Sequence, residues 1–265
     1  MVKGFFHIFN KMILTSKNNP FIKETVALKD KKGRKQTGLF LVEGVKMARE
    51  CQKSDFEIER IVVSESFSKS DAYAEFETSE TVCVSDDVFR LLSDEKTPQG
   101  VLCRVKIPVY GLDKLQESCL FLDGVSDPGN VGAIIRSANA AGYNEIYLTD
   151  DCADPYSPKA VRASMSGVFF TKIHQGNRES LLSALSDTPI IVADMRGENA
   201  FTFRAPEKFV LVIGNEANGV SAAVEDRATH TVKIPMSSTQ ESLNAAVSAG
   251  ILMYLLKKEA FSADK

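Results

Sequence analysis

The sequence predicts an α/β protein of two domains, the larger of which is built on a parallel sheet. Short stretches rich in apolar and β-branched residues alternate with stretches of helical character along the chain. Clusters of Gly, Pro, Asn and Asp separate these stretches, as turns require. With 265 residues, 44% of them hydrophobic, the chain is long enough for two modest domains with cores of their own.

Residues 1–108 predict a small α/β domain. Its first helix, over residues 19–35, is expected to end near Gly33 and to expose a basic side. Residues 1–12 are interpreted as a disordered extension, in which either Met1 or Met12 could serve as the initiator. The further predicted elements are strands over 38–43, 58–63, 81–84 and 100–105 and helices over 44–53, 71–77 and 86–93.

Residues 109–117, which follow Pro108, predict a linker because they combine Gly111 with a polar run. The rest of the chain, residues 118–265, predicts six strands with helices between them. Strands alternating with helices pair in parallel, because each crossover helix returns the chain to the same end of the sheet. The predicted strands cover 119–122, 145–149, 169–173, 190–193, 209–213 and 231–234, and the helices cover 131–141, 159–168, 178–185 and 245–256.

The stretch 210–249 indicates where a ligand binds. It contains an apolar strand VLVIG, a turn NEANGVS and the segment IPMSSTQESLNAAVSA. The strand ends at Gly214 and Ile234 leave backbone N–H and C=O groups open beside small polar residues. Ligands of parallel sheets bind outside the carboxyl ends of the strands. We therefore expect a cofactor pocket at these two strand ends.

The charge of the chain is unevenly distributed. The formal net charge is −3, but residues 1–46 carry a balance of +7, which leaves −10 for the remainder. A basic region on an acidic body is typical of a protein that meets a polyanion with one region only. The alternative is an ordinary solvated face rich in lysine. The candidates for phosphate contacts are Lys31, Lys32, Arg34 and Lys35.

The composition excludes several classes of protein. Five cysteines lie far apart with no CxxC pair and only three histidines in the chain, so neither a metal site nor a disulfide framework is expected. The apolar cluster FFHIF is too short for a signal sequence. The uncharged run 242–256 falls short of the roughly 20 residues that span a bilayer. We expect a cytoplasmic protein without a membrane segment.

The loop DGVSDPGNVG does not match the common nucleotide-binding loops. Gly124, Gly129 and Gly132 do not form G-x-G-x-x-G, and Asn130 stands where a P-loop needs lysine. These mismatches argue against a Rossmann oxidoreductase, a P-loop protein and a conventional Rossmann methyltransferase.

Three motifs together carry a resemblance to a known family. They are Asn130-x-Gly132-x-x-x-Arg136, then Gly214-Asn215-Glu216-x-x-Gly219, then Ile234-Pro235-Met236 with Ser242-Leu243-Asn244-x-x-x-x-Ala249. In this order they resemble motifs 1, 2 and 3 of the SpoU (TrmH-like) RNA methyltransferases of the SPOUT superfamily, over residues 118–258. The first domain resembles the ribosomal-protein-L30e-like RNA-binding domain that many members carry, with TPQGV at residues 97–101 near its end.

The resemblance implies an S-adenosylmethionine-dependent enzyme that methylates a ribose 2′-hydroxyl of RNA. It also implies a homodimer and a C-terminal trefoil knot, an exception to the rule that chains do not thread loops. The favoured substrate is 23S rRNA, since a basic first domain suits structured ribosomal RNA, and tRNA is the alternative. Two rivals remain, namely methylation of a base on the same fold and a non-catalytic RNA-binding or ribosome-assembly protein.

The same resemblance assigns the site residues. The catalytic candidates are Asn130, Arg136, Glu216, Ser242 and Asn244. The cofactor is expected to be held mainly by backbone at Ala193, Asp194, Gly214, Asn215, Gly219, Ile234, Met236 and Leu243, with no metal. Arg162 is a further candidate for RNA contact, with a solvated helix face as the alternative.

Chemistry suggests a role for each polar candidate. A guanidinium is a poor base at neutral pH, so Arg136 is expected to grip a neighbouring phosphate and orient the hydroxyl. Glu216 is expected to be partly buried and to form a salt link to Arg136, with proton transfer as the alternative. Ser242 and Asn244 can cap the last helix as well as meet the ribose. Asn130 and the motif glycines can also be simple turn residues.

Overall fold

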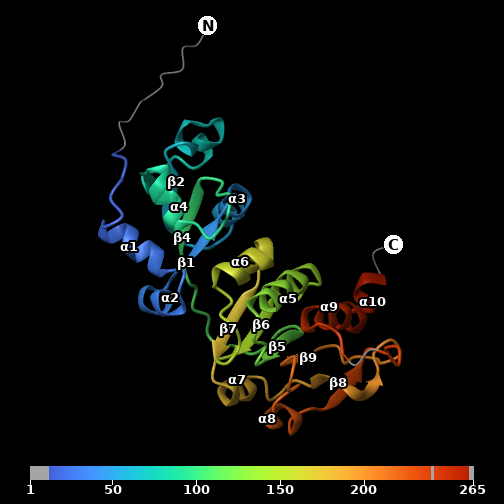
Figure 1. Cartoon of the computed structure of the whole chain (residues 1–265). Helices are drawn as coiled ribbons and strands as arrows, with labels where there is room; N and C mark the ends of the chain where they lie inside the picture. The colour runs from blue at the N-terminus through green and yellow to red at the C-terminus, as the bar shows by residue number, and fades with distance from the viewer. Residues whose placement is uncertain (1–11, 240–241, 263–265) are drawn as a thin grey trace. The chain divides into compact units, whose positions relative to one another are not determined.

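The computed structural model describes residues 12–239 and 242–262. The chain divides into two compact units, Met1–Ile107 and Pro108–Lys265, here called the N-terminal and C-terminal units (Figure 1). The predicted extension over residues 1–12 and the alternative start at Met1 lie, except for Met12 itself, outside the described residues. Within the described part of the chain, no helix is both long enough and apolar enough to cross a membrane.

The N-terminal unit has a four-stranded mixed sheet in the order β1-β4-β2-β3. Strand β4 is antiparallel to β1 and β2, whereas β2 and β3 are parallel. Apolar residues from all four strands and from α1 and α4 form a buried core. The elements are β1 (Leu39–Glu43), β2 (Ile58–Ser64), β3 (Thr81–Val84), β4 (Val101–Lys106), α1 (Pro20–Ala27), α2 (Lys31–Thr37), α3 (Val45–Lys53), α4 (Asp86–Leu92) and the 3-10 turns η1 (Phe67–Lys69) and η2 (Asp71–Glu75).

The single helix expected over residues 19–35 is wrong, because two helices occupy this stretch. Asn19 caps α1, with its side chain accepting from the Phe21 N–H, and α2 ends at Gly38, whose φ of 68° is left-handed. Gly33 lies inside α2, where an added Cβ would come within 2.0 Å of the Ala27 carbonyl oxygen. This glycine therefore allows α2 to pack closely on α1 and does not stop the helix.

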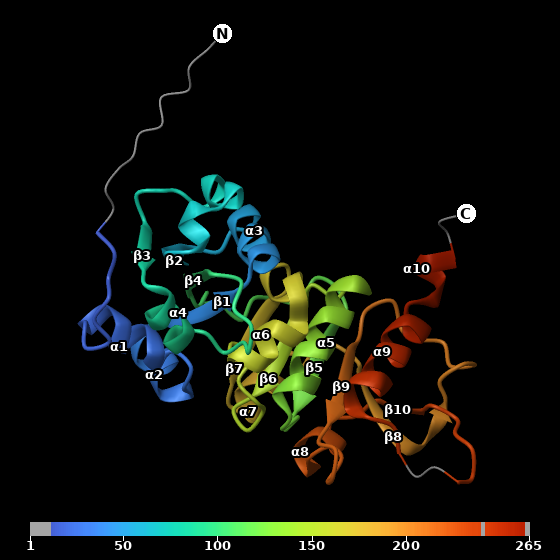
Figure 2. The same cartoon turned by 45° about the horizontal axis from the view of Figure 1, so that its top comes forward.

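The C-terminal unit has a six-stranded parallel sheet in the order β10-β8-β9-β5-β6-β7, as predicted. Helices α5, α6 and α9 cover one face of the sheet and α7 and α8 cover the other (Figures 1 and 2). The elements are β5 (Cys119–Asp123), β6 (Glu145–Thr149), β7 (Lys172–Gly176), β8 (Ile190–Asn199), β9 (Val210–Gly214), β10 (His230–Lys233), α5 (Pro128–Ala140), α6 (Pro158–Ser164), η3 (Met165–Phe169), α7 (Arg178–Ala184), α8 (Ala222–Glu225), α9 (Ala245–Leu256) and α10 (Lys258–Ser262).

Several boundaries of this unit differ from the prediction, among them the end of α6, which stops at Ser164 and not at residue 168. Strand β7 begins at Lys172 because the residues before it, from Met165 to Phe169, form the 3-10 turn η3. Helix α5 begins at Pro128, three residues earlier than expected, because Asp127 caps it and proline is favoured at the first helical position. Asn130 therefore lies in the first turn of α5 and not in a loop.

Strand β8 continues well beyond its predicted end and carries a bulge. Thr231 of β10 pairs with Val192, but Val232 pairs with Glu198, so residues 193–197 of β8 protrude between two pairs. An added Cβ at Gly197 would lie 2.5 Å from the Thr231 carbonyl, which explains why glycine returns the bulge to the sheet. The bulge carries Ala193 and Asp194 to the carboxyl end of the sheet. The trefoil knot stays a prediction.

Candidate active site

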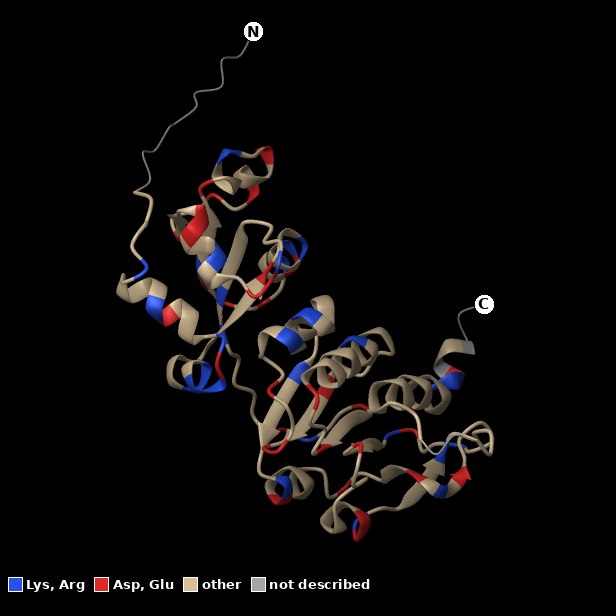
Figure 3. Ribbon diagram, in the orientation of Figure 1, with Lys and Arg blue, Asp and Glu red and all other residues tan. Residues whose placement is uncertain are grey.

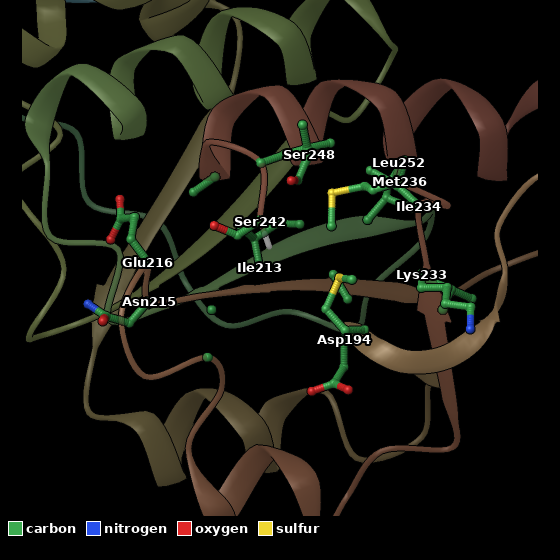
Figure 4. Close-up of a pocket in the computed structure, with 17 residues that line it drawn as sticks. Asp194, Ile213, Asn215, Glu216, Lys233, Ile234, Met236, Ser242, Ser248 and Leu252 are labelled. Atoms are coloured by element: carbon green, nitrogen blue, oxygen red, sulfur yellow. The ribbon is translucent and has the colours of Figure 1, made fainter. Parts of the chain in front are cut away.

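A pocket opens at the carboxyl ends of β8, β9 and β10, beside the first turns of α9 (Figure 4). Its walls combine apolar side chains such as Ile213, Val232 and Leu252 with a few polar groups. All eight residues that the sequence assigned to the cofactor line this one pocket, namely Ala193, Asp194, Gly214, Asn215, Gly219, Ile234, Met236 and Leu243. Glu216 and Ser242 of the catalytic set line it as well.

A tight turn from Asn215 to Gly219 follows β9, and its geometry requires the two motif glycines Gly214 and Gly219. Gly219 has a left-handed φ of 70°, and the N–H groups of Asn215 and Gly219 each donate to the other's carbonyl, at 2.8 and 3.0 Å. A Cβ at Gly214 would lie 2.4 Å from the Gly219 carbonyl carbon. The Asn215 side chain folds the turn by accepting from the N–H groups of Ala217 and Asn218. Backbone is consequently brought to the edge of the pocket.

Asp194 supplies a carboxylate to the pocket wall. Arg196 binds it through Nε at 2.9 Å and through Nη2 at 3.1 Å, and hydrogen bonding from this guanidinium holds the pKa of Asp194 below its usual range. Arg196 also reaches Glu225 at 3.2 Å. Asp194 thus stays an acceptor at neutral pH, suited to ribose hydroxyls or an amino group.

A chain of hydrogen bonds joins one residue from each of the three motifs. Asn244 Nδ2 donates to Asn130 Oδ1 at 2.9 Å, and Asn130 Nδ2 donates to Glu216 Oε1 at 2.7 Å. Ser126 Oγ extends the chain with a longer bond of 3.5 Å to Glu216 Oε2. Residues separated by 86 and 114 positions in sequence therefore meet at one edge of the pocket.

The first turn of α5 orients Asn130. Asp127 Oδ1 accepts from the Asn130 N–H at 2.9 Å, and Lys159 Nζ of α6 binds Asp127 Oδ2 at 2.7 Å. The hydrogen bond from Lys159 is the main reason that the pKa of Asp127 lies below its usual range. Asn244 is held in a similar way, since its Oδ1 caps α9 by accepting from the N–H groups of Ala246 and Val247.

Arg136 lies on the exposed side of α5 and has no hydrogen-bond or ion-pair partner among the described residues. Its helix is held by close packing. An added Cβ at Gly132 would lie 2.3 Å from the Ala160 carbonyl oxygen of α6, and one at Gly167 would lie 3.1 Å from Arg136 Cα. The motif glycine Gly132 is thus a packing residue, and the guanidinium of Arg136 is free to meet a substrate.

Two expectations about charged residues are wrong. Glu216 is exposed and pairs with Asn130, and in the described part of the chain no ion pair joins it to Arg136. Arg34 is only 3% exposed, and its Nη1 donates to the carbonyl oxygens of Leu28 and Lys29 at 2.8 Å each. Arg34 therefore binds the turn between α1 and α2 and is not available for phosphate.

The other predicted RNA contacts are exposed. Figure 3 shows the basic residues of α2, where Lys31, Lys32 and Lys35 lie at the surface and have no hydrogen-bond or ion-pair partner within the described ranges. Arg162 is exposed on α6. Ser242 is exposed two residues before the cap of α9.

Sequence reasoning missed several residues of the site. Ser126, Asp127 and Lys159 lie next to motif residues, and the helix signal Asp127-Pro128 was the available clue to the role of Asp127. Met195 and Lys233 line the pocket and were not predicted, because the β8 bulge and the last residue of β10 have no local signature. No three His, Cys, Asp or Glu side chains gather as a metal site anywhere in residues 12–239 or 242–262.

The residues of the pocket fit S-adenosylmethionine. Ile213, Leu252 and Met236 offer apolar surface for a purine, Asp194 offers an acceptor, and the strand ends offer backbone donors and acceptors. A parallel sheet with such a pocket at the carboxyl ends of its strands is typical of α/β proteins that bind a nucleotide-like ligand there.

Comparison with known proteins identifies the family. The SpoU rRNA Methylase family matches residues 117–254, and the MRM3-like substrate binding domain matches residues 19–103. The chain belongs to the SpoU rRNA Methylase family. It is thus an S-adenosylmethionine-dependent RNA methyltransferase, as the motifs predicted.

Individual relatives resemble the chain over both units. The 23S rRNA (guanosine(2553)-2′-O)-methyltransferase RlmP of Bacillus subtilis is 31% identical over 93% of this chain and 99% of its own. The 23S rRNA (uridine(2479)-2′-O)-methyltransferase of Streptomyces viridochromogenes is 29% identical over 94% of this chain and 93% of its own. The crystal structure of an AdoMet-bound rRNA methyltransferase from Sinorhizobium meliloti superimposes with a TM-score of 0.84, at 28% identity, over 94% of this chain and 98% of that one.

Proposed function

We propose that this chain transfers a methyl group from S-adenosylmethionine to a ribose 2′-hydroxyl in 23S ribosomal RNA. The hydrogen-bond chain of Asn130, Glu216 and Asn244 at the rim of the pocket carries the proposal. Relatives named as 23S rRNA 2′-O-methyltransferases align with both units, which supports ribosomal RNA as the substrate. The five free, buried cysteines suit the reducing cytoplasm, where ribosomal RNA is modified.

The chain must align the 2′-oxygen of the ribose with the methyl group of the cofactor. When bound, S-adenosylmethionine would supply the methyl group from its sulfonium sulfur and would leave as S-adenosylhomocysteine, while the hydroxyl proton is released to water. The eight residues of the pocket hold the cofactor, chiefly through backbone at Gly214, Ile234 and Leu243. The hydrogen-bonded residues Asn130, Glu216 and Asn244, here called the polar rim, then orient the ribose. The reacting atoms thereby meet at the distance and angle that displacement requires.

Arg136 holds the phosphate next to the reacting ribose. Its guanidinium is exposed and without a partner among the described residues, and the backbone around it is fixed by close packing at Gly132 and Gly167. A bidentate grip on phosphate fixes the nucleotide in register with the pocket.

Glu216 orients the hydrogen-bonded side chains of Asn130 and Asn244. It accepts from Asn130 at 2.7 Å and from Ser126 at 3.5 Å, so its carboxylate determines which way the Asn130 amide points. Asn130 then keeps its carbonyl oxygen toward Asn244. With Ser242 beside the pocket, these groups present donors and acceptors to the ribose hydroxyls.

The N-terminal unit supplies a surface for RNA backbone. Lys31, Lys32 and Lys35 of α2 are exposed and without a partner within the described ranges, which suits contacts to phosphate that carry no sequence information. Arg162 of α6 is exposed as well and is a further candidate for RNA contact in the C-terminal unit.

We infer that the chain works as a homodimer through α9. This helix, AAVSAGILMYLL, carries no charge, and it exposes Val247 and Tyr254 at 50% and 45% although its other side is buried. A helix that is apolar on both sides needs a second covering partner. Tyr254→Lys is expected to shift the protein from dimer to monomer in analytical ultracentrifugation, and an unchanged dimer would exclude α9 from the interface.

The proposed function is tested by transfer of labelled methyl from S-adenosylmethionine to rRNA and tRNA taken from a strain that lacks the gene. We expect label in 23S rRNA as a 2′-O-methylated nucleotide, and a loss of at least about 100-fold with Arg136→Ala. Arg204→Ala, an exposed arginine of the same unit away from the pocket, serves as the control. Label in tRNA alone would contradict the rRNA substrate. Label on a base would contradict ribose methylation, and absence of cofactor binding would indicate a non-catalytic protein.

A further inference from the structure

A buried carboxylate lies behind the turn that carries Glu216. Asp123 ends strand β5 and is 2% exposed. Its Oδ2 accepts from the Ser221 N–H at 2.6 Å, and its Oδ1 accepts from Arg178 Nε, also at 2.6 Å. A buried charge is stable only when it is paired and hydrogen bonded, and Asp123 meets both conditions through these two neighbours.

Arg178 shares its charge with a second carboxylate. It is the first residue of α7, and its Nη2 binds Asp151 Oδ2 at 2.7 Å, just beyond the end of β6. Asp151 Oδ1 in turn accepts from Thr149 Oγ1 at 2.5 Å. One guanidinium therefore joins the ends of β5 and β6 to the start of α7.

Asp123 and Gly124 hold both ends of the Asn215–Gly219 turn, which carries Glu216. Asp123 binds Ser221, two residues after the turn closes at Gly219. The next residue, Gly124, accepts from Asn215 Nδ2 at 2.8 Å, where the turn begins. Residues 123–124 thus fix the entry and the exit of the segment that presents Glu216 to Asn130.

We propose that Arg178 is a positioning residue for methyl transfer, which pairs with the buried Asp123 carboxylate and thereby holds the Asn215–Gly219 turn in register with Asn130. The inference rests on the proposed function and extends it to a residue outside the three motifs. Arg178 touches neither the pocket lining nor the polar rim.

The pairing gives the sign of the effect. Arg178 binds Asp123 through Nε and Asp151, from the loop after β6, through Nη2. Removal of the guanidinium leaves the buried Asp123 carboxylate without its charged partner, which is unfavourable. The carboxylate would then shift toward water, and its hold on the Ser221 N–H would weaken.

The test compares Arg178→Gln with the double variant Asp123→Asn, Arg178→Gln. The double variant removes the buried charge together with its partner, while the asparagine oxygen can still accept from Ser221. Arg227→Gln is the matched control, since Arg227 is an exposed arginine that pairs with Glu179 of the same helix α7. Hydrogen exchange of the amides in residues 215–221 is measured at one pH, together with kcat and KM of methyl transfer.

We expect Arg178→Gln to exchange faster in this segment and to lose about tenfold in kcat, with a KM for S-adenosylmethionine close to that of the wild type, since Arg178 makes a hydrogen bond to a charged group and does not line the pocket. The double variant should recover much of both losses, because no unpaired charge is left buried, and Arg227→Gln should match the wild type. Equal exchange and equal kcat in Arg178→Gln and the wild type would overturn the proposal.

Two further outcomes are distinguishable. If Arg178→Gln does not fold, Arg178→Lys takes its place; it keeps the charge but reaches only one carboxylate at a time, so intermediate exchange supports the proposal and wild-type exchange contradicts it. If the wild type transfers no methyl group, the proposed function fails, whereas the exchange comparison still decides whether Arg178 holds the turn.

Discussion

Asn130 of the first motif is hydrogen bonded to a residue of each of the other two motifs. Its backbone N–H binds Asp127, its side-chain oxygen accepts from Asn244 and its side-chain nitrogen donates to Glu216. A half-buried amide with all of these bonds has one orientation, because a flipped amide would place a nitrogen against the Asn244 donor. The carboxylate of Glu216 therefore determines the donor-to-acceptor direction of this series of hydrogen bonds, because it can only accept.

Substitution of Glu216 tests whether this side chain orients Asn130 or takes the proton from the ribose hydroxyl. Glu216→Gln retains an oxygen that accepts from Asn130, so kcat should fall by less than about tenfold, whereas Glu216→Ala should cost about 100-fold because a bond to a charged group is lost. Both variants should keep the wild-type free energy of unfolding within about 0.5 kcal/mol, since the side chain is exposed. Equal losses, together with a shifted pH–rate profile for Glu216→Gln, would assign Glu216 as the base.

Asn244 has two roles that one substitution can separate: its Oδ1 caps helix α9, and its Nδ2 donates to Asn130. Asn244→Asp keeps the oxygen that caps the helix but replaces the Nδ2 donor with a carboxylate oxygen facing Asn130. We expect kcat to fall at least about tenfold, with no loss in the free energy of unfolding. Asn244→Ala should cost about 1 kcal/mol of stability as well.

The control for this helix cap lies in the other unit. Asn19 caps α1 by accepting from the Phe21 N–H at 2.9 Å, so Asn19→Asp makes the same chemical change away from the site. It should leave kcat unchanged. Wild-type turnover in Asn244→Asp would show that the bond between Asn244 and Asn130 has no part in the reaction.

The packing of two helices on α5 predicts opposite effects for two glycine substitutions. Gly132→Ala, at the contact with α6, should destabilise the protein by about 1–3 kcal/mol, because its Cβ would lie 2.3 Å from the Ala160 carbonyl oxygen. Gly250→Ala in α9 should stabilise it by about 0.5–1 kcal/mol, because among the described residues its Cβ would meet only Ser137 Oγ of α5, at 3.9 Å. Urea unfolding followed by circular dichroism measures both, and a stable Gly132→Ala variant would show that the two helices can move apart at little cost.

At the scale of the whole molecule, the division of labour between the two units predicts a salt effect. Replacement of Lys31, Lys32 and Lys35 by alanine should weaken RNA binding and reduce the slope of log K against log salt by about 2 to 3, as expected for three lost phosphate contacts. Methyl transfer at saturating RNA should persist, because the catalytic rim lies in the other unit.

A matched triple variant makes this salt test specific. Lys53, Lys69 and Lys106 belong to the same unit and are exposed, but each already pairs with a glutamate. Their replacement by alanine should leave the salt slope close to that of the wild type. An equal change in both triple variants would show that net charge alone governs binding.

The sequence by itself determined the six-stranded parallel sheet and most element boundaries. These features depend on local signals: β-branched runs, turn residues and helix caps act within a few positions of where they occur. The cofactor candidates came from the resemblance of the three motifs to a known family. Helix α9 was predicted over the residues that form it, and the eight cofactor candidates line one pocket. Motif order added the family, and with it the cofactor.

Only the tertiary structure decided how distant elements meet. Arg34 follows two lysines and looks equally basic in sequence, yet the close approach of α2 to α1 at Gly33 buries it. The bulge of β8, the pairing of Glu216 with Asn130 and the frame around Asp123 likewise depend on which strands are neighbours. Local patterns specify which side of an element is buried, whereas contacts between elements follow from strand order and close packing, which no short stretch of sequence contains.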